Sequence, residues 1–149
     1  MIRQGQITDF DQILPLCEQF WSYTEYDEPF EPEEALNKLN LACEFGLLGV
    51  VELDDEIVGF CAGAKAPLLG NANSVVGVEL AWWINPEHRN SRWGSKLFDF
   101  MEQLARDAGI KYWCMVSLQS CNPDPVNRFY ESKGYHLTEM TYMRCLWPS

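Results

Sequence analysis

The sequence is poor in positive charge and has almost no histidine. Its 149 residues include 11 Lys and Arg against 22 Asp and Glu, which gives a formal net charge of -11, and only 2 His. A chain this acidic repels phosphate backbones, so the composition argues against general nucleic-acid binding. The same charge favours partners that are cationic or carry an amine.

Long apolar runs are also missing. No stretch approaches the roughly 20 apolar residues of a membrane-spanning helix, and Met1 to Gly5 form no signal-peptide core. We therefore expect a protein of the cytoplasm that does not enter the membrane. The 6 cysteines are scattered, with no pair at metal-ligand spacing, so we expect no metal site.

The order of the expected elements indicates one α/β (α+β) domain over residues 1–149. Hydrophobic residues make up 47% and charged residues 22%, which are globular values. Apolar spacing and turn residues predict a strand over 2–6, a helix from Thr8 or Asp9, a helix after Pro32, two strands around Asp54-Asp55, a strand over 73–84, a helix ended by Gly109, a strand over 112–118, a short helix capped by Asp124, and one or two strands over 135–147.

An acidic segment, "EYDEPFEPEE", covers residues 25–34 and has six acids in ten positions. It is interpreted either as a solvated loop and helix start or as an anionic rim that attracts a cationic substrate. Under the second interpretation, the residues that contact the substrate are Glu25, Tyr26, Asp27 and Glu28.

The most basic passage is "NPEHRNSRWGSKLF", residues 85–98, and we call residues 85–95 the basic loop. It leaves an apolar strand and enters a helix, where unpaired N–H groups and the helix dipole favour an anion. Further donors for a phosphate or pyrophosphate would be Arg89, Asn90, Ser91, Arg92 and Ser95. The alternative is an exposed helix start whose arginines pair with nearby acids.

Two motifs in this region and beyond it resemble those of the GNAT superfamily of acyl-CoA-dependent N-acyltransferases. Residues 89–94, "RNSRWG", are similar to the signature Arg/Gln-x-x-Gly-x-Gly/Ala, and "NPDPVNRFYESKGYH", residues 122–136, is similar to the second signature. The resemblance implies a single-domain fold with a mixed central sheet of six to seven strands and about four helices. It also implies a splay between the fourth and fifth strands.

The resemblance implies acetyl-CoA as the acyl-donor cosubstrate. Its pyrophosphate would contact backbone N–H groups of the basic loop, and its pantetheine arm would lie along the fourth strand. The cofactor-binding residues implied in this way are Ala81, Trp82, Trp83, Ile84, Arg89, Asn90, Ser91, Arg92, Trp93, Gly94, Ser95, Asn122 and Arg128.

Arg92 departs from the family pattern, which usually has glycine at this position. Glycine lets the backbone approach the diphosphate without a Cβ. An arginine keeps the N–H but adds bulk, and its guanidinium offers a direct contact with a phosphate.

Two residues are candidates for catalysis. The resemblance implies that Tyr130 is the general acid for the departing thiolate, although its helical face also fits a core position. Glu79 is a candidate base because it is a carboxylate on an otherwise apolar strand, where burial raises a carboxyl pKa. Simple alternation places Glu79, Ala81 and Trp83 on one face. A surface or paired role for Glu79 and a water-relayed base remain alternatives.

These observations predict an N-acetyltransferase that acts on a small-molecule or peptide primary amine through a direct ternary complex. The alternative is a non-catalytic CoA-binding or interaction module with the same fold. The resemblance also allows a homodimer, because family members often dimerise.

Overall fold

The computed structural model describes residues 1–147 of the chain. These residues divide into two compact units, Met1–Val116 and the segment from Ser117 onward, and each is described by itself. The expectation of one domain over the whole chain stays a prediction.

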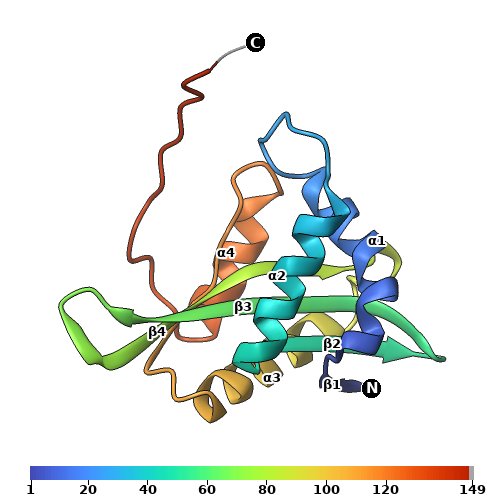
Figure 1. The fold of residues 1–149 in the computed structure, drawn as a ribbon, viewed down its shortest axis with the longest axis horizontal. Coiled ribbons are helices and arrows are strands. Elements are labelled where there is room, and N and C mark those ends of the chain that lie inside the picture. The colour runs from blue at the N-terminus through green and yellow to red at the C-terminus, as the bar shows by residue number, and fades with distance from the viewer. Residues whose placement is uncertain (148–149) are drawn as a thin grey trace. The chain divides into compact units, whose positions relative to one another are not determined.

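A five-stranded mixed sheet organises the first unit (Figure 1). Its strands occur in chain order and only the last pair is parallel, whereas the other neighbours are antiparallel. The strands are β1 (Ile2–Gln4), β2 (Leu48–Leu53), β3 (Glu56–Leu68), β4 (Asn71–Ile84) and β5 (Tyr112–Cys114). Asp54 and Asp55 form the β2–β3 turn at the position that the sequence predicted, and their φ values of 50° and 65° are those of a two-residue hairpin turn.

Three helices of this unit are α1 (Phe10–Trp21), α2 (Pro32–Phe45) and α3 (Trp93–Asp107), and short 3-10 turns occur at η1 (Ile7–Asp9) and η2 (Pro86–His88). Pro32 stands in the first turn of α2, and Gly46 ends that helix with a φ of 71°. Gly109, with a φ of 76°, follows α3 as the sequence predicted.

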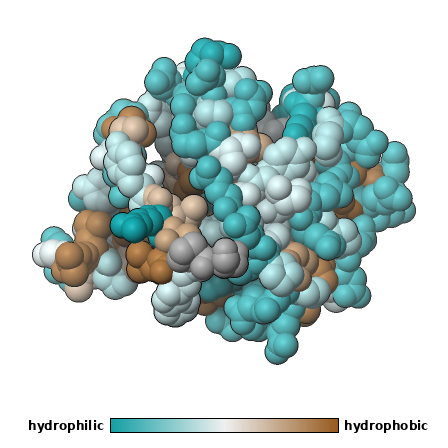
Figure 2. Space-filling view, turned by 90° about the horizontal axis from the view of Figure 1, so that it is seen from above, coloured by the Kyte–Doolittle hydropathy of each residue, from teal (hydrophilic) through white to brown (hydrophobic). Residues whose placement is uncertain are grey.

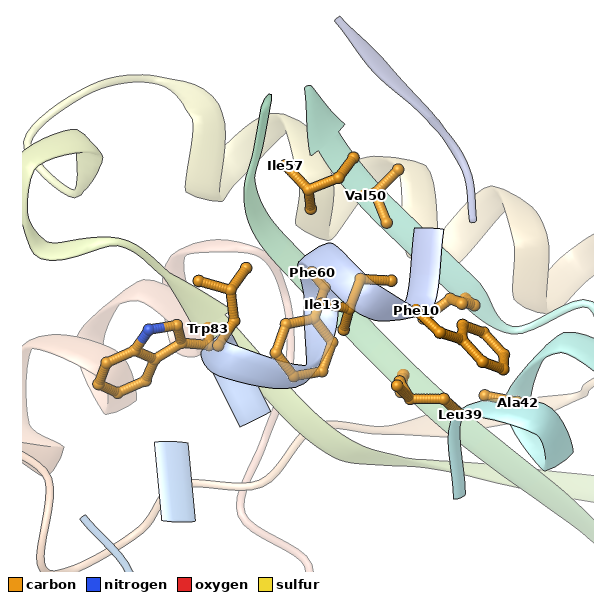
Figure 3. Packing of buried hydrophobic residues seen from close by; sticks show 11 residues of the cluster. Phe10, Ile13, Leu39, Ala42, Val50, Ile57, Phe60 and Trp83 are labelled. Atoms are coloured by element: carbon orange, nitrogen blue, oxygen red, sulfur yellow. The ribbon is translucent and has the colours of Figure 1, made fainter. Parts of the chain in front are cut away.

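The helices cover both faces of the sheet (Figure 1). Phe10 and Ile13 of α1 and Leu39 of α2 pack with Phe60 on one face (Figure 3). On the other face, Leu97 and Met101 of α3 pack with a second cluster that includes Val51 and Cys61. The sheet is thus the middle layer, and the apolar runs of β2 and β3 are explained by burial on both sides.

Hydrophilic residues dominate the face of the molecule seen in Figure 2, and hydrophobic residues form separate patches on it. No helix within residues 1–147 has both the length and the apolar character needed to cross a membrane.

The second unit contains α4 (Pro123–Ser132). Asn122, with a φ of 44°, precedes this helix, so the predicted start with Asp124 as the cap is too late. Pro123 fits the first turn because its missing N–H would have no intrahelical acceptor there.

The prediction of six to seven strands was wrong, because the described residues form five. Residues 135–147 have strand-forming composition, but they pair with no strand in the described part of the chain, and Leu137 and Tyr142 are exposed. Such a segment becomes a strand only when a neighbour accepts its backbone groups. The mixed sheet and four helices that the sequence predicted are confirmed.

Candidate active site

The basic loop joins the end of β4 to the start of α3. The Asn85 N–H bonds to the Val58 carbonyl at 2.8 Å and ties the beginning of the loop to the sheet. Later in the loop, Ser91 Oγ donates to the His88 carbonyl and accepts from the Trp93 N–H at 3.4 Å. The loop therefore has internal bonds that set the direction in which α3 begins.

The start of α3 offers the donors expected of an anion site. The N–H groups of the first helical turn, including those of Gly94 and Ser95, have no intrahelical acceptor by geometry. Arg92, the residue before the helix, has φ of -70° and ψ of -3°, which any residue adopts. The arginine at the usual glycine position therefore causes no backbone strain.

Cationic side chains surround Trp93 at this helix start. The Arg92 guanidinium carbon lies 6.0 Å from the Trp93 ring centroid, and Lys96 Nζ lies 5.2 Å from it. No acidic residue occurs in the first turn of α3. Because the helix dipole is positive at this end, the local charge favours an anionic ligand.

The Arg89 side chain makes contacts within the protein. Its Nε donates to the Ile84 carbonyl at 2.8 Å, and its guanidinium lies 4.1 Å from the Trp83 ring centroid. These contacts hold the basic loop against the end of β4. The sequence did not suggest this arrangement, because it depends on how the chain turns between β4 and η2.

β4 and β5 diverge as the resemblance implied. Their pairing covers only Val76–Val78 of β4 and Tyr112–Cys114 of β5, whereas β4 continues to Ile84. The predicted strand over 112–118 is thus shorter. The Asn85 N–H bonds to β3, and in an antiparallel pair the backbone groups of alternate residues bond to the partner strand. The N–H groups of Trp82 and Ile84, which lie between the bonded positions, therefore point away from β3. This edge of β4 is suited to contact an extended ligand.

A β-bulge separates the two halves of β4. Ala62 pairs with Ala81 and Gly63 pairs with Glu79, so Leu80 is the additional residue. Ala81 and Trp83 pack with the cluster beneath α1 and α2, whereas Gly63, the partner of Glu79, faces Trp113 of the other cluster. The expectation that simple alternation keeps Glu79 on the face of Ala81 and Trp83 was therefore wrong.

Glu79 is a buried carboxyl at the point where β4 and β5 diverge. Its side chain is 6% exposed, and its Oε2 accepts the Val116 N–H at 3.1 Å. Burial raises the pKa of Glu79 to about 7, although the hydrogen bond from Val116 acts in the opposite direction. Val116 lies two residues beyond the end of β5, so this hydrogen bond joins the chain after β5 to a side chain of β4. A carboxyl with a pKa near 7 can also accept a proton at neutral pH.

Tyr130 belongs to the second unit. It is buried in α4, with ring centroids 6.2 Å from Phe129 and 6.1 Å from Tyr135. Its carbonyl accepts the Tyr135 N–H at 3.0 Å, which closes the end of the helix. Arg128 is exposed on the same helix. Asn122 precedes α4, and its side chain makes no hydrogen bond that caps the start of the helix.

The acidic segment follows α1 and leads into α2. Glu25, Tyr26, Asp27 and Glu28 are all exposed. The Tyr26 ring stacks on Trp21, with centroids 5.5 Å apart and planes 18° apart, and Trp21 Nε1 donates to the Glu28 carbonyl at 2.9 Å. These contacts give part of the segment a fixed position at the end of α1.

The Cα of Gly94 lies in the first turn of α3 and faces Trp82. A Cβ added at Gly94 would lie 3.7 Å from Cζ2 of Trp82, which is an ordinary contact distance. The helix start, its cations and the diverging edge of β4 therefore fit an acyl-CoA. Within residues 1–147, no group of three His, Cys, Asp or Glu side chains could hold a metal ion.

A family model identifies the class of protein that this fold and loop define. The model of the acetyltransferase (GNAT) family matches residues 11–135. Because the match includes most of the chain, the protein belongs to the GNAT acetyltransferase family. A comparison with curated protein sequences finds no match.

Solved structures show the same fold at low sequence identity. A predicted acetyltransferase from Clostridium acetobutylicum, solved with acetyl-CoA, has a TM-score of 0.76 and 17% identity, over 98% of this chain and 96% of that chain. An aminoglycoside antibiotic 6'-N-acetyltransferase from Acinetobacter haemolyticus has a TM-score of 0.71 and 14% identity, over 100% and 99%. Glucosamine-6-phosphate N-acetyltransferase from Arabidopsis thaliana has a TM-score of 0.73 and 15% identity, over 98% of this chain and 97% of that chain.

Proposed function

We propose that this protein is an N-acetyltransferase that transfers an acetyl group from acetyl-CoA to a primary amine through a direct ternary complex. The observation that supports the proposal is a basic helix start that follows the part of β4 beyond its pairing with β5. Membership of the acetyltransferase family and the acetyl-CoA in the Clostridium acetobutylicum structure support the choice of donor.

Acetyl-CoA supplies an activated thioester when it is bound. The N–H groups of the basic loop and first turn of α3, from Arg89 to Ser95, contact the diphosphate. The edge of β4 from Ala81 to Ile84 contacts the pantetheine arm through backbone groups. Asn122 and Arg128 are proposed as further donors from the second unit.

Acyl transfer requires a neutral amine, and a free lysine-like amine has a pKa near ~10.4. Glu79 is proposed as the base, directly or through a water, because its pKa of about 7 allows it to accept a proton at neutral pH. Tyr130 is proposed as the acid that protonates the leaving thiolate, on the strength of its place in the second family motif.

The acceptor is proposed to be a cationic amine. The exposed carboxylates at residues 25, 27 and 28 attract a positive charge, and the exposed Tyr26 ring offers a cation–π contact. The net charge of -11 increases the encounter rate with such a substrate. The aminoglycoside named for the Acinetobacter haemolyticus enzyme is a cationic amine of this class, whereas glucosamine-6-phosphate shares only the amine.

Thiol release from acetyl-CoA in the presence of a panel of amines tests this function. The panel should include a polyamine, an aminoglycoside, an amino sugar phosphate and a lysine peptide. We expect at least one amine to accelerate thiol release above the rate with buffer alone. Binding of acetyl-CoA without thiol release for any amine would instead support a non-catalytic CoA-binding module.

Arg92 is proposed to contact the diphosphate through its guanidinium. It is exposed, is unstrained and lies at the positive end of α3. A hydrogen bond to a charged group contributes about 1.5 to 3 kcal/mol, so Arg92→Gly should weaken acetyl-CoA binding about tenfold or more in a calorimetric titration. The control is Arg106→Ala, at the other end of α3, which should leave the affinity unchanged. Equal or tighter binding by Arg92→Gly would show that only the backbone N–H is used.

A further inference from the structure

A continuous set of contacts joins the basic loop to the acidic segment through Trp83. The Arg89 guanidinium lies 4.1 Å from the centroid of the indole ring. Trp83 Nε1 donates to Gln19 Oε1 of α1 at 3.1 Å, and the centroid of the Tyr23 ring lies 5.0 Å from that of Trp83. Trp83 occupies the left end of the apolar cluster in Figure 3, beside α1.

The contacts continue along α1 to the proposed acceptor residues. Trp21, two positions after Gln19, stacks on Tyr26 and donates to the Glu28 carbonyl. The step from Gln19 to Trp21 passes through the backbone of α1, and each of the other steps from Arg89 to Glu28 is a direct side-chain contact. All of these residues lie in the first compact unit.

We propose that Trp83 is a positioning residue that couples acyl-CoA binding at the basic loop to the order of the end of α1 and the acidic segment. A diphosphate at the start of α3 holds the basic loop, and thus Arg89, against the indole. The indole in turn fixes Gln19, and with it the turn of α1 that carries Trp21. This inference rests on the proposed acyl-CoA and amine sites, and it adds that the donor prepares the acceptor site.

Trp83 is suited to this role because it is only 4% exposed, whereas Gln19 and Tyr23, which contact it, are exposed residues. A buried indole N–H without an acceptor is costly, so the Gln19 amide oxygen is held in place although Gln19 is an exposed residue. The position of α1 near Gln19 is therefore linked to the position of the indole. Coupling between two sites requires such a shared element.

Hydrogen–deuterium exchange of the full chain, with and without acetyl-CoA, tests the coupling. In the wild type, acetyl-CoA should slow exchange in a peptide covering residues 19–28. Gln19→Leu removes the acceptor of the indole N–H and should abolish this protection while acetyl-CoA affinity changes by less than about threefold. In steady-state kinetics, the same variant should raise the KM for the amine about fivefold or more without lowering kcat.

Two further variants separate coupling from stability. Gln19→Glu keeps an acceptor oxygen and should retain the protection. Gln12→Leu removes another glutamine of α1, whose Oε1 accepts the Ile57 N–H at 2.9 Å. It should also retain the protection, because this hydrogen bond joins α1 to β3 and not to Trp83. If Gln12→Leu also loses the protection of residues 19–28 by acetyl-CoA, the loss in Gln19→Leu reflects general destabilisation of α1, and the inference is overturned.

The outcomes distinguish this inference from the proposed function. If acetyl-CoA does not bind to the wild type, both fail. If it binds but leaves exchange of residues 19–28 unchanged, or if Gln19→Leu keeps full protection, only the coupling is overturned.

Discussion

Replacing Tyr130 with phenylalanine is expected to lower kcat about 100-fold or more while acetyl-CoA affinity changes little. A general acid contributes about 100- to 10,000-fold to a proton-transfer step, and phenylalanine lacks the hydroxyl that would protonate the thiolate. The ring contacts with Phe129 and Tyr135 remain in the variant, so the helix should stay folded. Steady-state thiol release and calorimetric titration with acetyl-CoA measure the two quantities separately.

Tyr135→Phe is the matched control for this experiment. Tyr135 belongs to the same motif, and its ring centroid lies 6.1 Å from that of Tyr130. We expect its kcat to stay within about threefold of the wild type, because the proposal gives its hydroxyl no proton to transfer. Equal effects of the two substitutions would assign Tyr130 a structural role in α4 and remove it from the mechanism.

Glu79→Gln is expected to reduce kcat/KM about 100-fold at pH 8 and to remove one ionisation from its pH dependence. The buried Glu79 carboxyl has a pKa of about 7 and must be deprotonated to act as a base, so the wild-type rate should rise through this pH. The amine acceptor titrates as well, and its contribution cancels in the ratio of wild-type to variant kcat/KM. That ratio should increase from pH 5 to 8 with a midpoint near the pKa of Glu79.

The same variant separates a catalytic role from a structural one. A glutamine side-chain oxygen can still accept the Val116 N–H, so the hydrogen bond at the divergence of β4 and β5 is kept. If Glu79 only holds this backbone, Glu79→Gln should have nearly wild-type activity and the ratio should not change with pH. That result would exclude Glu79 as the base.

The pKa of Glu79 also has a consequence for stability. The folded-state pKa is raised from 4.5 to about 7, so between these values the folded protein binds more protons than the unfolded chain. The contribution of Glu79 to stability is therefore fully favourable below about pH 4.5, and it is lost as the pH rises through 7. The loss corresponds to about 3 kcal/mol, and Glu79→Gln should lack this pH dependence in urea unfolding.

Local patterns predicted much of the fold correctly. The apolar spacing of α1 and α3, the Pro32 start of α2 and the Asp54-Asp55 turn depend on residues close in sequence. Strand formation by residues 135–147 failed as a prediction because pairing depends on a partner strand, which composition does not supply.

The site was predictable to the extent that motifs specify it. The basic loop and its helix start were identified from residues 85–98. For Glu79 the sequence left a surface or paired position open beside the base, and the structure shows that the residue is buried. The bulge at Leu80 was not predictable, because one extra residue in a long apolar strand leaves no distinct pattern. The Trp83–Gln19 bond joins residues 64 positions apart, and nothing in the local sequence of either residue indicates it.

Calorimetric titration of the wild type and of Gly94→Ala with acetyl-CoA tests the central claim most directly, namely that the basic loop binds the diphosphate of an acyl-CoA. In the free protein, a Cβ at Gly94 would contact Trp82 at an ordinary 3.7 Å, so the melting temperature should not fall. Against a bound diphosphate the same Cβ causes a steric conflict of about 1 to 3 kcal/mol, which predicts an affinity at least about fivefold weaker. Saturable binding by the wild type with this loss in Gly94→Ala is the expected result, and absence of binding by the wild type at millimolar acetyl-CoA would contradict the account.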